Sequence, residues 1–316
     1  MTYAPIALFT YSRADHTKLA VESLLRNKEA ADSDLYVFSD GPKTEAKREA
    51  VEENRRYIHT IKDKDENKNK KCFRSVTIVE RERNWGLANS LIAGITEIVN
   101  RYGRVIVVED DLILSPYFLR YMNEALEKYK DDDRVASISA FLNPIDCEAP
   151  ETFFLRYFAC WGWATWKRGW DLLINDDKEL LRRLRWRKHA FNIDGTGPFY
   201  EILYCDKIGL NSSWAVRFYA SQFLAGKLQL FPGHTMAIQT GNDGSGTHGN
   251  TGNNTFDSMS LYMKPILLQD IAIEENREMY KAFARFYASK MNKRFFKDKY
   301  NYAKSFIRRL LGLDFR

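Results

Sequence analysis

Long apolar runs, a signal peptide and closely spaced cysteines are all missing from this 316-residue sequence. A membrane-spanning helix needs roughly twenty consecutive apolar residues, and no stretch approaches that length. The N-terminus has no basic start, and the apolar run Ile6–Phe9 is too short for a signal peptide, so we expect none. The four cysteines are far apart and match no metal-ligand pattern, which favours reduced thiols. We therefore expect a cytoplasmic protein.

Excess positive charge is missing from most of the chain, although the net charge is +6. Residues 291–316 contain eight Lys or Arg and two Asp, so the rest of the chain has equal numbers of basic and acidic residues. A neutral body disfavours nucleic-acid binding. In the tail, apolar residues recur at helical spacing between Phe295 and Leu313, with cations between them. This predicts an amphipathic helix that either lies on an anionic membrane surface or docks on the body of the protein.

Strand-like and helix-like patterns alternate along the first half of the chain. Short apolar runs predict strands at residues 6–11, 35–38, 76–79 and 105–108, and helical patterns follow them at about 15–27, 44–61, 86–102 and 116–129. Such alternation is typical of an α/β fold with a mostly parallel sheet and helices on both faces. Further along, we expect a strand at 135–140, helices at 198–208 and 213–225, and short strands at 228–231 and 236–239.

Three adjacent carboxylates, Glu109, Asp110 and Asp111, directly follow the fourth predicted strand. Adjacent anions repel one another, so they need a cation, and ligands of open α/β sheets bind where the chain leaves the carboxyl end of a strand. A hard divalent metal carrying a phosphate-bearing ligand would satisfy this site, because Mg²⁺ and Mn²⁺ prefer oxygen ligands. The alternative is an acidic turn in which Ser115 or Asp111 caps a helix that begins near Pro116.

The stretch Val-Val-Glu-Asp-Asp-Leu at residues 107–112 resembles the metal-binding acidic motif of glycosyltransferases with the GT-A fold. In its Glu-Asp-Asp form it is similar to the N-acetylglucosaminyltransferase I family and to bacterial relatives near glycosyltransferase family 2. Other segments match in the same order up to about residue 250. The resemblance implies a Rossmann-like GT-A domain with a nucleotide-sugar-binding half at 1–140 and an acceptor-side and lid half at 141–260. A C-terminal helical region would follow at 261–316 and end in the basic tail.

The resemblance also implies roles for residues that follow the first three predicted strands. Arg13 and Asp40 correspond to the pair that holds the uracil ring of a UDP-sugar donor. Arg83 begins the segment that contacts the donor sugar and diphosphate. Considered one at a time, the two arginines also fit solvated surface positions, and Asp40 also fits a turn cap.

A metal site follows from the same comparison. Asp111 matches the carboxylate that binds Mn²⁺ or Mg²⁺, while Glu109 and Asp110 would face the sugar and the ribose. The glycine-rich segment at residues 241–250 resembles the lid of these transferases, and its His248 would contact the metal or a phosphate. A flexible surface connection is the alternative interpretation of this segment.

Aromatic residues are concentrated between residues 153 and 170, where they include the segment Cys-Trp-Gly-Trp at 160–163. A cluster this dense is either a core seam or a platform on which sugars stack. We interpret Trp161 and Trp163 as acceptor-binding candidates, because Gly162 lets the backbone approach a ligand closely and the related enzymes have a Gly-Trp segment in this position. Trp214 is the third acceptor-binding candidate.

Sugar transfer usually needs a base that takes the proton of the acceptor hydroxyl. In N-acetylglucosaminyltransferase I this base is an aspartate immediately before a Trp, and the matching acidic positions here are Ser212 and Ser213. A neutral serine cannot be the base unless another group activates it. We therefore expect a displaced carboxylate, with Asp243 preferred over Asp206 and Glu201, although an aspartate beside glycine also fits an ordinary turn.

Together the motifs predict an inverting, metal-dependent glycosyltransferase that moves GlcNAc or another hexose from a UDP-sugar to a glycan or lipid-linked acceptor in surface polysaccharide synthesis. One alternative is a nucleotidyltransferase that makes nucleotide-sugars, but residues 10–17 lack the glycine of its phosphate loop. Another is a non-catalytic protein that binds a sugar nucleotide or a glycan. The basic stretch at 182–189 would suit an anionic acceptor or nucleic acid, but a solvated helix face is the better interpretation.

Overall fold

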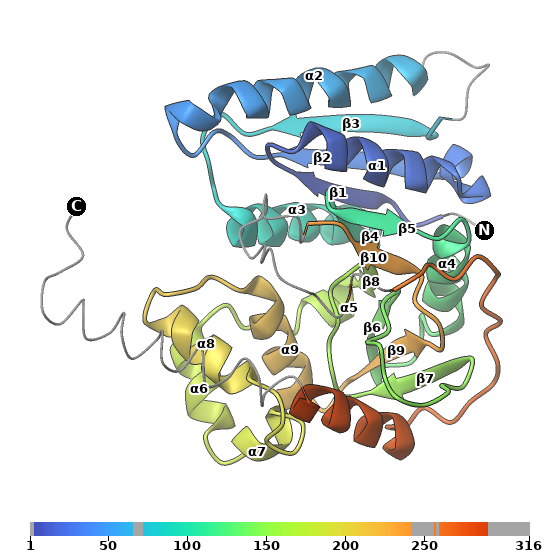
Figure 1. The fold of residues 1–316 in the computed structure, drawn as a ribbon, viewed down its shortest axis with the longest axis vertical. Helices are drawn as coiled ribbons and strands as arrows, with labels where there is room; N and C mark the ends of the chain where they lie inside the picture. The colour runs from blue at the N-terminus through green and yellow to red at the C-terminus, as the bar shows by residue number, and fades with distance from the viewer. Residues whose placement is uncertain (1–2, 66–71, 242–255, 257–258, 290–316) are drawn as a thin grey trace, which may run out of the picture.

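An eight-stranded sheet forms the centre of the computed structural model, which describes residues 3–65, 72–241, 256 and 259–289 (Figure 1). The strands are β1 (Ile6–Thr10), β2 (Asp34–Ser39), β3 (Ser75–Glu80), β4 (Arg104–Glu109), β5 (Leu112–Leu114), β6 (Val135–Ser139), β7 (Thr152–Leu155), β8 (Trp163–Trp166), β9 (Leu228–Pro232) and β10 (Ala237–Gln239). The large sheet has the order β3-β2-β1-β4-β8-β6-β9-β7, and all of its strands except β8 and β7 run in one direction. β5 and β10 form a separate antiparallel pair.

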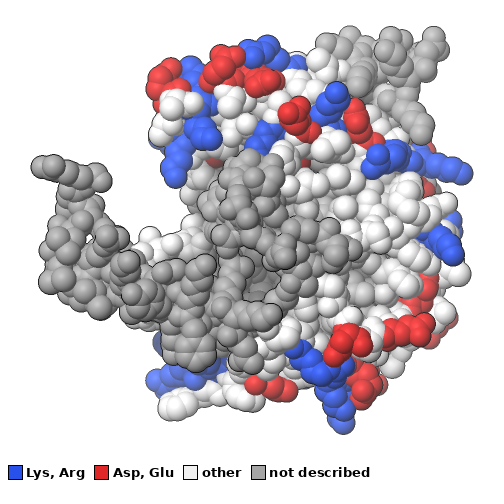
Figure 2. Space-filling view, in the orientation of Figure 1, with Lys and Arg blue, Asp and Glu red and all other residues white. Residues whose placement is uncertain are grey.

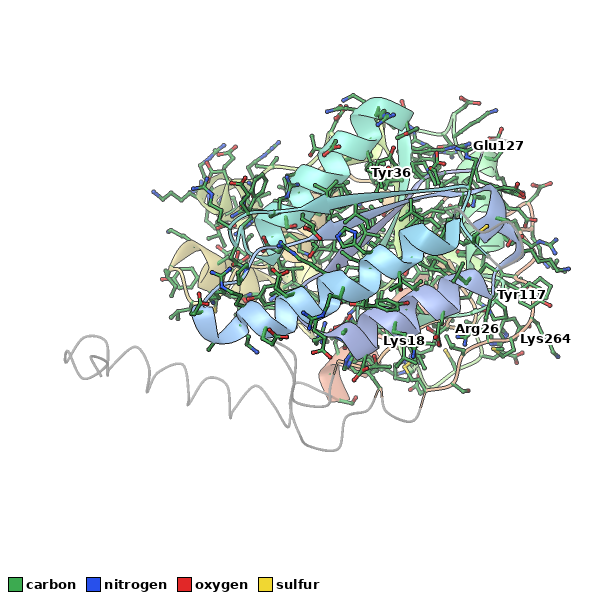
Figure 3. All side chains as sticks on the ribbon, turned by 90° about the horizontal axis from the view of Figure 1, so that it is seen from above. Lys18, Arg26, Tyr36, Tyr117, Glu127 and Lys264 are labelled. Carbon is green, nitrogen blue, oxygen red and sulfur yellow. The ribbon has the colours of Figure 1, made fainter. Side chains whose placement is uncertain are left out.

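Helices cover both faces of this sheet, as predicted for an α/β fold. On one face α1 and α2 lie side by side (Figure 3, where Lys18 marks α1), and α3 covers the other face. The helices are α1 (Ala14–Leu25), α2 (Arg48–Asp65), α3 (Leu87–Tyr102), α4 (Phe118–Lys128), α5 (Lys167–Trp170), α6 (Asp177–Leu184), α7 (Lys188–Phe191), α8 (Phe199–Lys207) and α9 (Trp214–Leu224), with the 3₁₀ turns η1 (Lys28–Asp32) and η2 (Glu45–Lys47). A further helix covers residues 277–289.

Successive residues of the central strands belong to opposite layers of the core. In β1, Ile6 and Leu8 join the hydrophobic cluster that contains α1, α2 and α4, whereas Ala7 and Phe9 join the cluster that contains α3, α6 and α9. This alternation follows from the two-residue period of a strand, and burial on both sides explains the uninterrupted apolar runs. At Gly94 of α3 a Cβ atom would lie 2.7 Å from the Phe9 ring, so glycine lets this helix approach the sheet closely.

The elements predicted for the first half of the chain occur within a few residues of the expected bounds, but β5, β7 and β8 were not expected from the sequence. The basic stretch at 182–189 is not one helix, because α6 ends at Leu184 and α7 begins at Lys188. Residues 1–140 and 141–260 both contribute strands to the large sheet. In the part of the chain that the structure describes, no helix is both long and apolar enough to span a membrane.

Candidate active site

The acidic turn lies at the edge of the sheet where the parallel strands β1 to β4 end. Glu109 is the last residue of β4 and pairs with Phe9 of β1, while Asp110 and Asp111 form the turn into β5. The loop that follows β1 contacts this turn, and the loops after β2 and β3 contact each other at the same edge of the sheet, as the rule for open α/β sheets predicts. A short strand follows the turn, so Asp111 does not cap a helix. Ser115 Oγ accepts the Tyr117 N–H at 3.3 Å just before α4, so the alternative is correct in part.

Arg13, in the loop after β1, is the counter-charge for the acidic turn. Its Nη2 atom lies 2.5 Å from Oδ1 of Asp110 and 3.1 Å from Oδ2 of Asp111. The Tyr11 N–H and the Thr10 hydroxyl also donate to Asp110, at 3.3 and 3.4 Å, so this carboxylate is directed toward the loop after β1. Asp110 therefore positions Arg13, and the ribose contact implied by the resemblance stays a prediction.

The second terminal nitrogen of Arg13, Nη1, is buried without a hydrogen-bond partner among the described residues. A buried unpaired N–H of this kind costs about 1–3 kcal/mol, more when it is charged. Such an atom is a ready donor for an oxygen of a bound ligand. The uracil contact that the resemblance implies for Arg13 stays a prediction.

Glu109 and Asp111 are the members of the triplet that keep acceptor positions free. Glu109 accepts no hydrogen bond from a described residue, and Asp111 accepts at Oδ2 from Arg13 and from Gln239 Nε2, the latter at 3.3 Å. Burial, together with the charges of Asp111 and Asp110, raises the pKa of Glu109 to about 8, and Arg13 offsets only part of this effect. The turn therefore needs a further positive charge, either a proton or a cation.

Asp40, after β2, uses all of its acceptor capacity within the chain. Its Oδ1 accepts the N–H groups of Gly41 at 3.0 Å and Trp85 at 2.9 Å, and its Oδ2 accepts Gly86 N–H at 2.9 Å and Asn84 Nδ2 at 3.0 Å. A carboxylate offers about four acceptor sites, and this one is 5% exposed. Asp40 therefore holds the turn before α3, and its contact with uracil stays a prediction.

The turn that Asp40 holds contains Arg83. A Cβ atom on Gly41 would lie 2.5 Å from the carbonyl carbon of Arg83, so the two loops are packed against each other. The Arg83 side chain is exposed and forms no ion pair with a described residue. The neighbouring Trp85 is partly exposed, and the Arg81 guanidinium lies 3.9 Å from the centre of its ring. The structure thus brings the predicted donor segment beside Asp40, with a cationic side chain in solvent.

A segment from far along the chain completes the site. Gln239 pairs with Leu112 in the β5–β10 sheet, and the backbone N–H of Thr240 donates to the carbonyl of Asp111 at 2.8 Å. At Gly241 a Cβ atom would lie 2.5 Å from Asp111 Oδ2 and 2.9 Å from Arg13 Nη1. Glycine at this position therefore lets the backbone lie directly against the ion pair. No sequence pattern predicts this contact, because it depends on the pairing of two three-residue strands.

Cys160 is a site residue that was not singled out from the sequence. Burial raises the pKa of its thiol, and the charge of nearby Glu109 raises it further. The adjacent Trp161 is partly buried, with its ring centre 4.4 Å from that of Phe141 and 5.0 Å from that of Phe256. The acceptor role of Trp161 stays a prediction, and its position next to Cys160 places it on the acidic-turn side of β8.

Two of the tryptophans predicted to bind the acceptor are core residues. Trp163 is fully buried and stacks on Trp214, with ring centres 5.5 Å apart. Neither side chain presents a face to an acceptor, so the predicted contact is wrong for both. Gly162 has φ of 67° and packs against the Phe118 ring. Glycine is therefore needed here for the backbone conformation and the close packing, not for the approach of a ligand.

Asp206 is not placed to act as the base. Its side chain is 0% exposed, it accepts the Ser213 N–H at 2.9 Å, and it lies 3.7 Å from Arg217. Burial raises the pKa of Asp206 to about 6. Ser213 is itself the N-cap of α9, since its hydroxyl accepts the Val216 N–H. These residues join α8 to α9, so the prediction for Asp206 is wrong.

Glu201 is engaged elsewhere. It lies 2.6 Å from Lys188 Nζ and accepts a hydrogen bond from Asn192 Nδ2 at 2.8 Å. These residues line a surface hollow that shares no residue with the acidic turn, so the prediction of Glu201 as the base is also wrong. Asp243, His248 and the basic tail at 291–316 lie outside the described residues.

The donor set of the acidic turn fits a divalent cation held jointly with a ligand. No group of three metal-binding side chains occurs within the described residues. Mg²⁺ is commonly bound through one or two carboxylates and the phosphates of a substrate, so a dedicated protein cage is not required. Within the part of the chain that the structure describes, no hydrogen bond reaches Oδ1 of Asp111 or the carboxylate of Glu109, so both residues have the oxygen donors for such a site.

Comparison with known proteins gives one family match. The model of the GNT-I family matches residues 1–176, which is more than half of the chain and includes every loop from Arg13 to Asp111. No curated protein sequence matches. A solved structure of a UDP-glucose pyrophosphorylase complexed with UDP-glucose is similar over 72% of this chain and 90% of its own, with 11% sequence identity and a TM-score of 0.36.

Proposed function

The chain belongs to the GNT-I family and is a UDP-sugar-dependent glycosyltransferase, and we propose that it transfers the sugar with inversion to a glycan or lipid-linked acceptor with the help of Mn²⁺ or Mg²⁺. The observation behind this proposal is the meeting of Arg13, Glu109 and Asp111 at the carboxyl ends of β1 and β4. A nucleotidyltransferase or a non-catalytic binding protein, the two alternatives from the sequence, are disfavoured by the family.

The free polar atoms of the site suggest how the donor is held. Nη1 of Arg13, which has no hydrogen-bond partner among the described residues, would donate to a uracil oxygen. The carboxylate of Glu109, to which none of these residues donates, would accept a hydrogen bond from a sugar hydroxyl. Asp111 would hold the metal together with the donor diphosphate. A bound divalent cation supplies positive charge that offsets the charge developing on the leaving diphosphate.

Inversion requires one direct displacement at the anomeric carbon, with the acceptor hydroxyl on the side opposite to the diphosphate. A carboxylate that takes the hydroxyl proton is then needed on the acceptor side. With Asp206 and Glu201 excluded by their contacts, Asp243 is the base that we propose.

Binding of the donor tests this function directly. Calorimetric titration with UDP and UDP-GlcNAc, in Mn²⁺ and in EDTA, should show binding that depends on the metal. The D111N variant should lose this dependence while remaining folded, because the amide has the shape of the carboxylate and removes one of three crowded negative charges; thermal unfolding without metal checks that it is folded. D171N, which alters an exposed ion pair with Lys167, is the matched control and should bind as the wild type does.

The possible outcomes separate the parts of the proposal. Metal-dependent binding followed by slow release of the sugar supports transfer. Equal binding by D111N and the wild type would remove the metal assignment, and no binding of any nucleotide would overturn the donor site as a whole.

For the tail, we propose peripheral attachment to an anionic membrane on the cytoplasmic side. Deletion of residues 291–316 should move the protein to the soluble fraction. Unchanged partitioning would contradict this proposal.

A further inference from the structure

A hollow of about 430 Å³ lies among α6, α7 and α8, away from the acidic turn. In Figure 1 these helices form the lower part of the molecule, whereas α1 and α2 lie at the top. The volume of the hollow falls within the range of sites that bind small molecules, about 300–1,000 Å³. The residues that line it are Arg185, Trp186, Lys188, His189, Asn192, Gly195, Gly197 and Glu201.

Trp186 is the most exposed aromatic side chain at this hollow. The residue is 84% exposed, and the Arg185 guanidinium lies 4.8 Å from the centre of its ring. Folded proteins rarely leave a Trp side chain this open, and Trp and Arg are the residues most enriched at the centres of binding sites. A flat indole at the rim of a hollow matches the apolar C–H face of a sugar ring.

The wall of the hollow carries hydrogen-bonding groups suited to hydroxyls. Glu201 accepts from Asn192 at 2.8 Å and pairs with Lys188 at 2.6 Å, so a carboxylate, an amide and an ammonium group are held side by side. A carboxylate accepts hydrogen bonds from sugar hydroxyls, and an amide both donates and accepts them. This wall therefore suits an occupant that is rich in hydroxyl groups.

The positive charge at the rim of the hollow comes mainly from Arg185. Among the described residues no carboxylate pairs with Arg185 or Arg187, whereas Lys188 pairs with Glu201 and His189 lies 3.8 Å from Asp194. Figure 2 shows Lys and Arg side chains at the lower left edge of the molecule, in the region of α6 and α7. An occupant with its own negative charge would be attracted to this rim.

The loop at the far side of the hollow is held in a strained backbone conformation. Ile193, Asp194 and Gly195 have φ values of 48°, 52° and 76° in succession. A β-branched residue with positive φ is an outlier that costs of order 1–3 kcal/mol, and such strain is concentrated at functional sites. Burial of Ile193 and a 3.0 Å hydrogen bond from Tyr280 to Asp194 hold the loop in place.

We propose that this hollow is a second saccharide site that binds an acidic oligosaccharide, one ring stacked on Trp186, hydroxyls facing Glu201 and Asn192, and a carboxylate near Arg185. The assignment of this saccharide as part of the acceptor glycan rests on the proposed function. The site would bind the acceptor chain at a point far from the reacting hydroxyl. Binding at such a point helps to position the hydroxyl for the reaction.

The test is titration of the full chain with tetragalacturonate, an acidic probe, and with maltotetraose, a neutral one. The acidic probe should bind at least tenfold more tightly than the neutral one. W186A should weaken its binding about tenfold, and R185Q should reduce the preference for the acidic probe. L267A removes an apolar side chain that is 58% exposed elsewhere on the surface and should bind as the wild type does. Because Trp186 and Leu267 are exposed, both variants should fold normally.

Each contrary result has a definite meaning. Failure of both tetrasaccharides to bind, or equal binding by W186A and wild type, would overturn the proposal. Preferential binding of anionic vesicles or of single-stranded RNA, lost in W186A, would show a membrane or nucleic-acid surface instead. Titration of the wild type with both ligands separates the two proposals. Metal-dependent binding of UDP without binding of tetragalacturonate would contradict only the second site. Binding of tetragalacturonate without binding of UDP would contradict only the donor site.

Discussion

The guanidinium of Arg13 lies 3.1 Å from the carboxylate of Asp111, although the two residues are 98 positions apart in the sequence. Arg13 thus neutralises part of the negative charge of Asp110 and Asp111 from one side of the acidic turn. A single guanidinium cannot balance three carboxylates, as the raised pKa of Glu109 indicates. Binding of a metal with an anionic donor would therefore complete the charge balance that Arg13 begins.

Replacing Arg13 with Gln tests this balance. In EDTA, R13Q should lose about 3 kcal/mol of unfolding free energy, because removal of one partner leaves buried carboxylates uncompensated. Saturating Mn²⁺ should stabilise R13Q more than wild type, as measured by urea unfolding. R74Q, which breaks a more exposed pair with Asp34, should lose less than about 1 kcal/mol and show no such difference. An equal response of R13Q and wild type to Mn²⁺ would contradict the prediction.

The turn before α3 should depend on the charge of Asp40. In D40N an amide N–H₂ would face the N–H donors of Trp85 and Gly86, so at least one hydrogen bond to a charged acceptor is lost and a donor is left unpaired. We expect a loss of about 3 kcal/mol in unfolding free energy together with weaker UDP binding. Thermal unfolding and calorimetry of the same sample measure both. Full stability in D40N would mean that Asp40 is not the residue that holds this turn.

Gly241 should affect binding more than stability. The methyl group of G241A would displace Asp111 Oδ2 or Arg13 Nη1, both ends of side chains that can move at small cost. UDP affinity should fall about tenfold, which is about 1.4 kcal/mol, with little change in the midpoint of thermal unfolding. T240S keeps the hydroxyl that donates to the Asp111 carbonyl and should behave as wild type. Unchanged affinity in G241A would place the ligand away from this contact.

Asp206 predicts a pH dependence of stability. Its folded-state pKa of about 6 lies above that of an unfolded Asp, near 3.9, so the folded protein binds this proton more tightly. The contribution is fully present below pH 4 and is lost as the pH rises through 6. Relative to D206N, which has no titrating group, the wild type should therefore lose about 2 kcal/mol of unfolding free energy between pH 4 and pH 7. A difference that does not change with pH would contradict the raised pKa.

The sequence predicted the nucleotide-binding side of the fold because its signals are local. Strands buried on both faces appear as apolar runs, and the parallel order places the residues after them at one edge, so Arg13, Asp40 and Asp111 were expected near one another. The structure brings them together, but it assigns Asp40 to backbone N–H groups of the next loop. The residue types in a loop do not reveal the direction in which its backbone N–H groups point.

The acceptor side was harder to predict, because burial there depends on packing between distant segments. Trp163 and Trp161 are two residues apart and look alike in the sequence, yet β8 directs the first into the core and leaves the second partly exposed. Glu201 and Asp206 were chosen as carboxylates on a helix near Ser212, but their partners come from other elements. Charge type alone does not distinguish a structural carboxylate from a catalytic one.

The pairing of β5 with β10 makes the length of the chain between β9 and β10 as important as its composition. A one-residue insertion or deletion there would shift Gln239 relative to Leu112, turn alternate side chains of β10 to the opposite face, and move Gly241 away from Asp111. Surface loops usually tolerate such changes in length. This segment is buried except at His234, and a Cβ atom at Gly233 would lie 2.2 Å from the Pro150 carbonyl oxygen. Homologues that keep this activity should therefore preserve the number of residues between β9 and β10 and vary there chiefly at the position of His234.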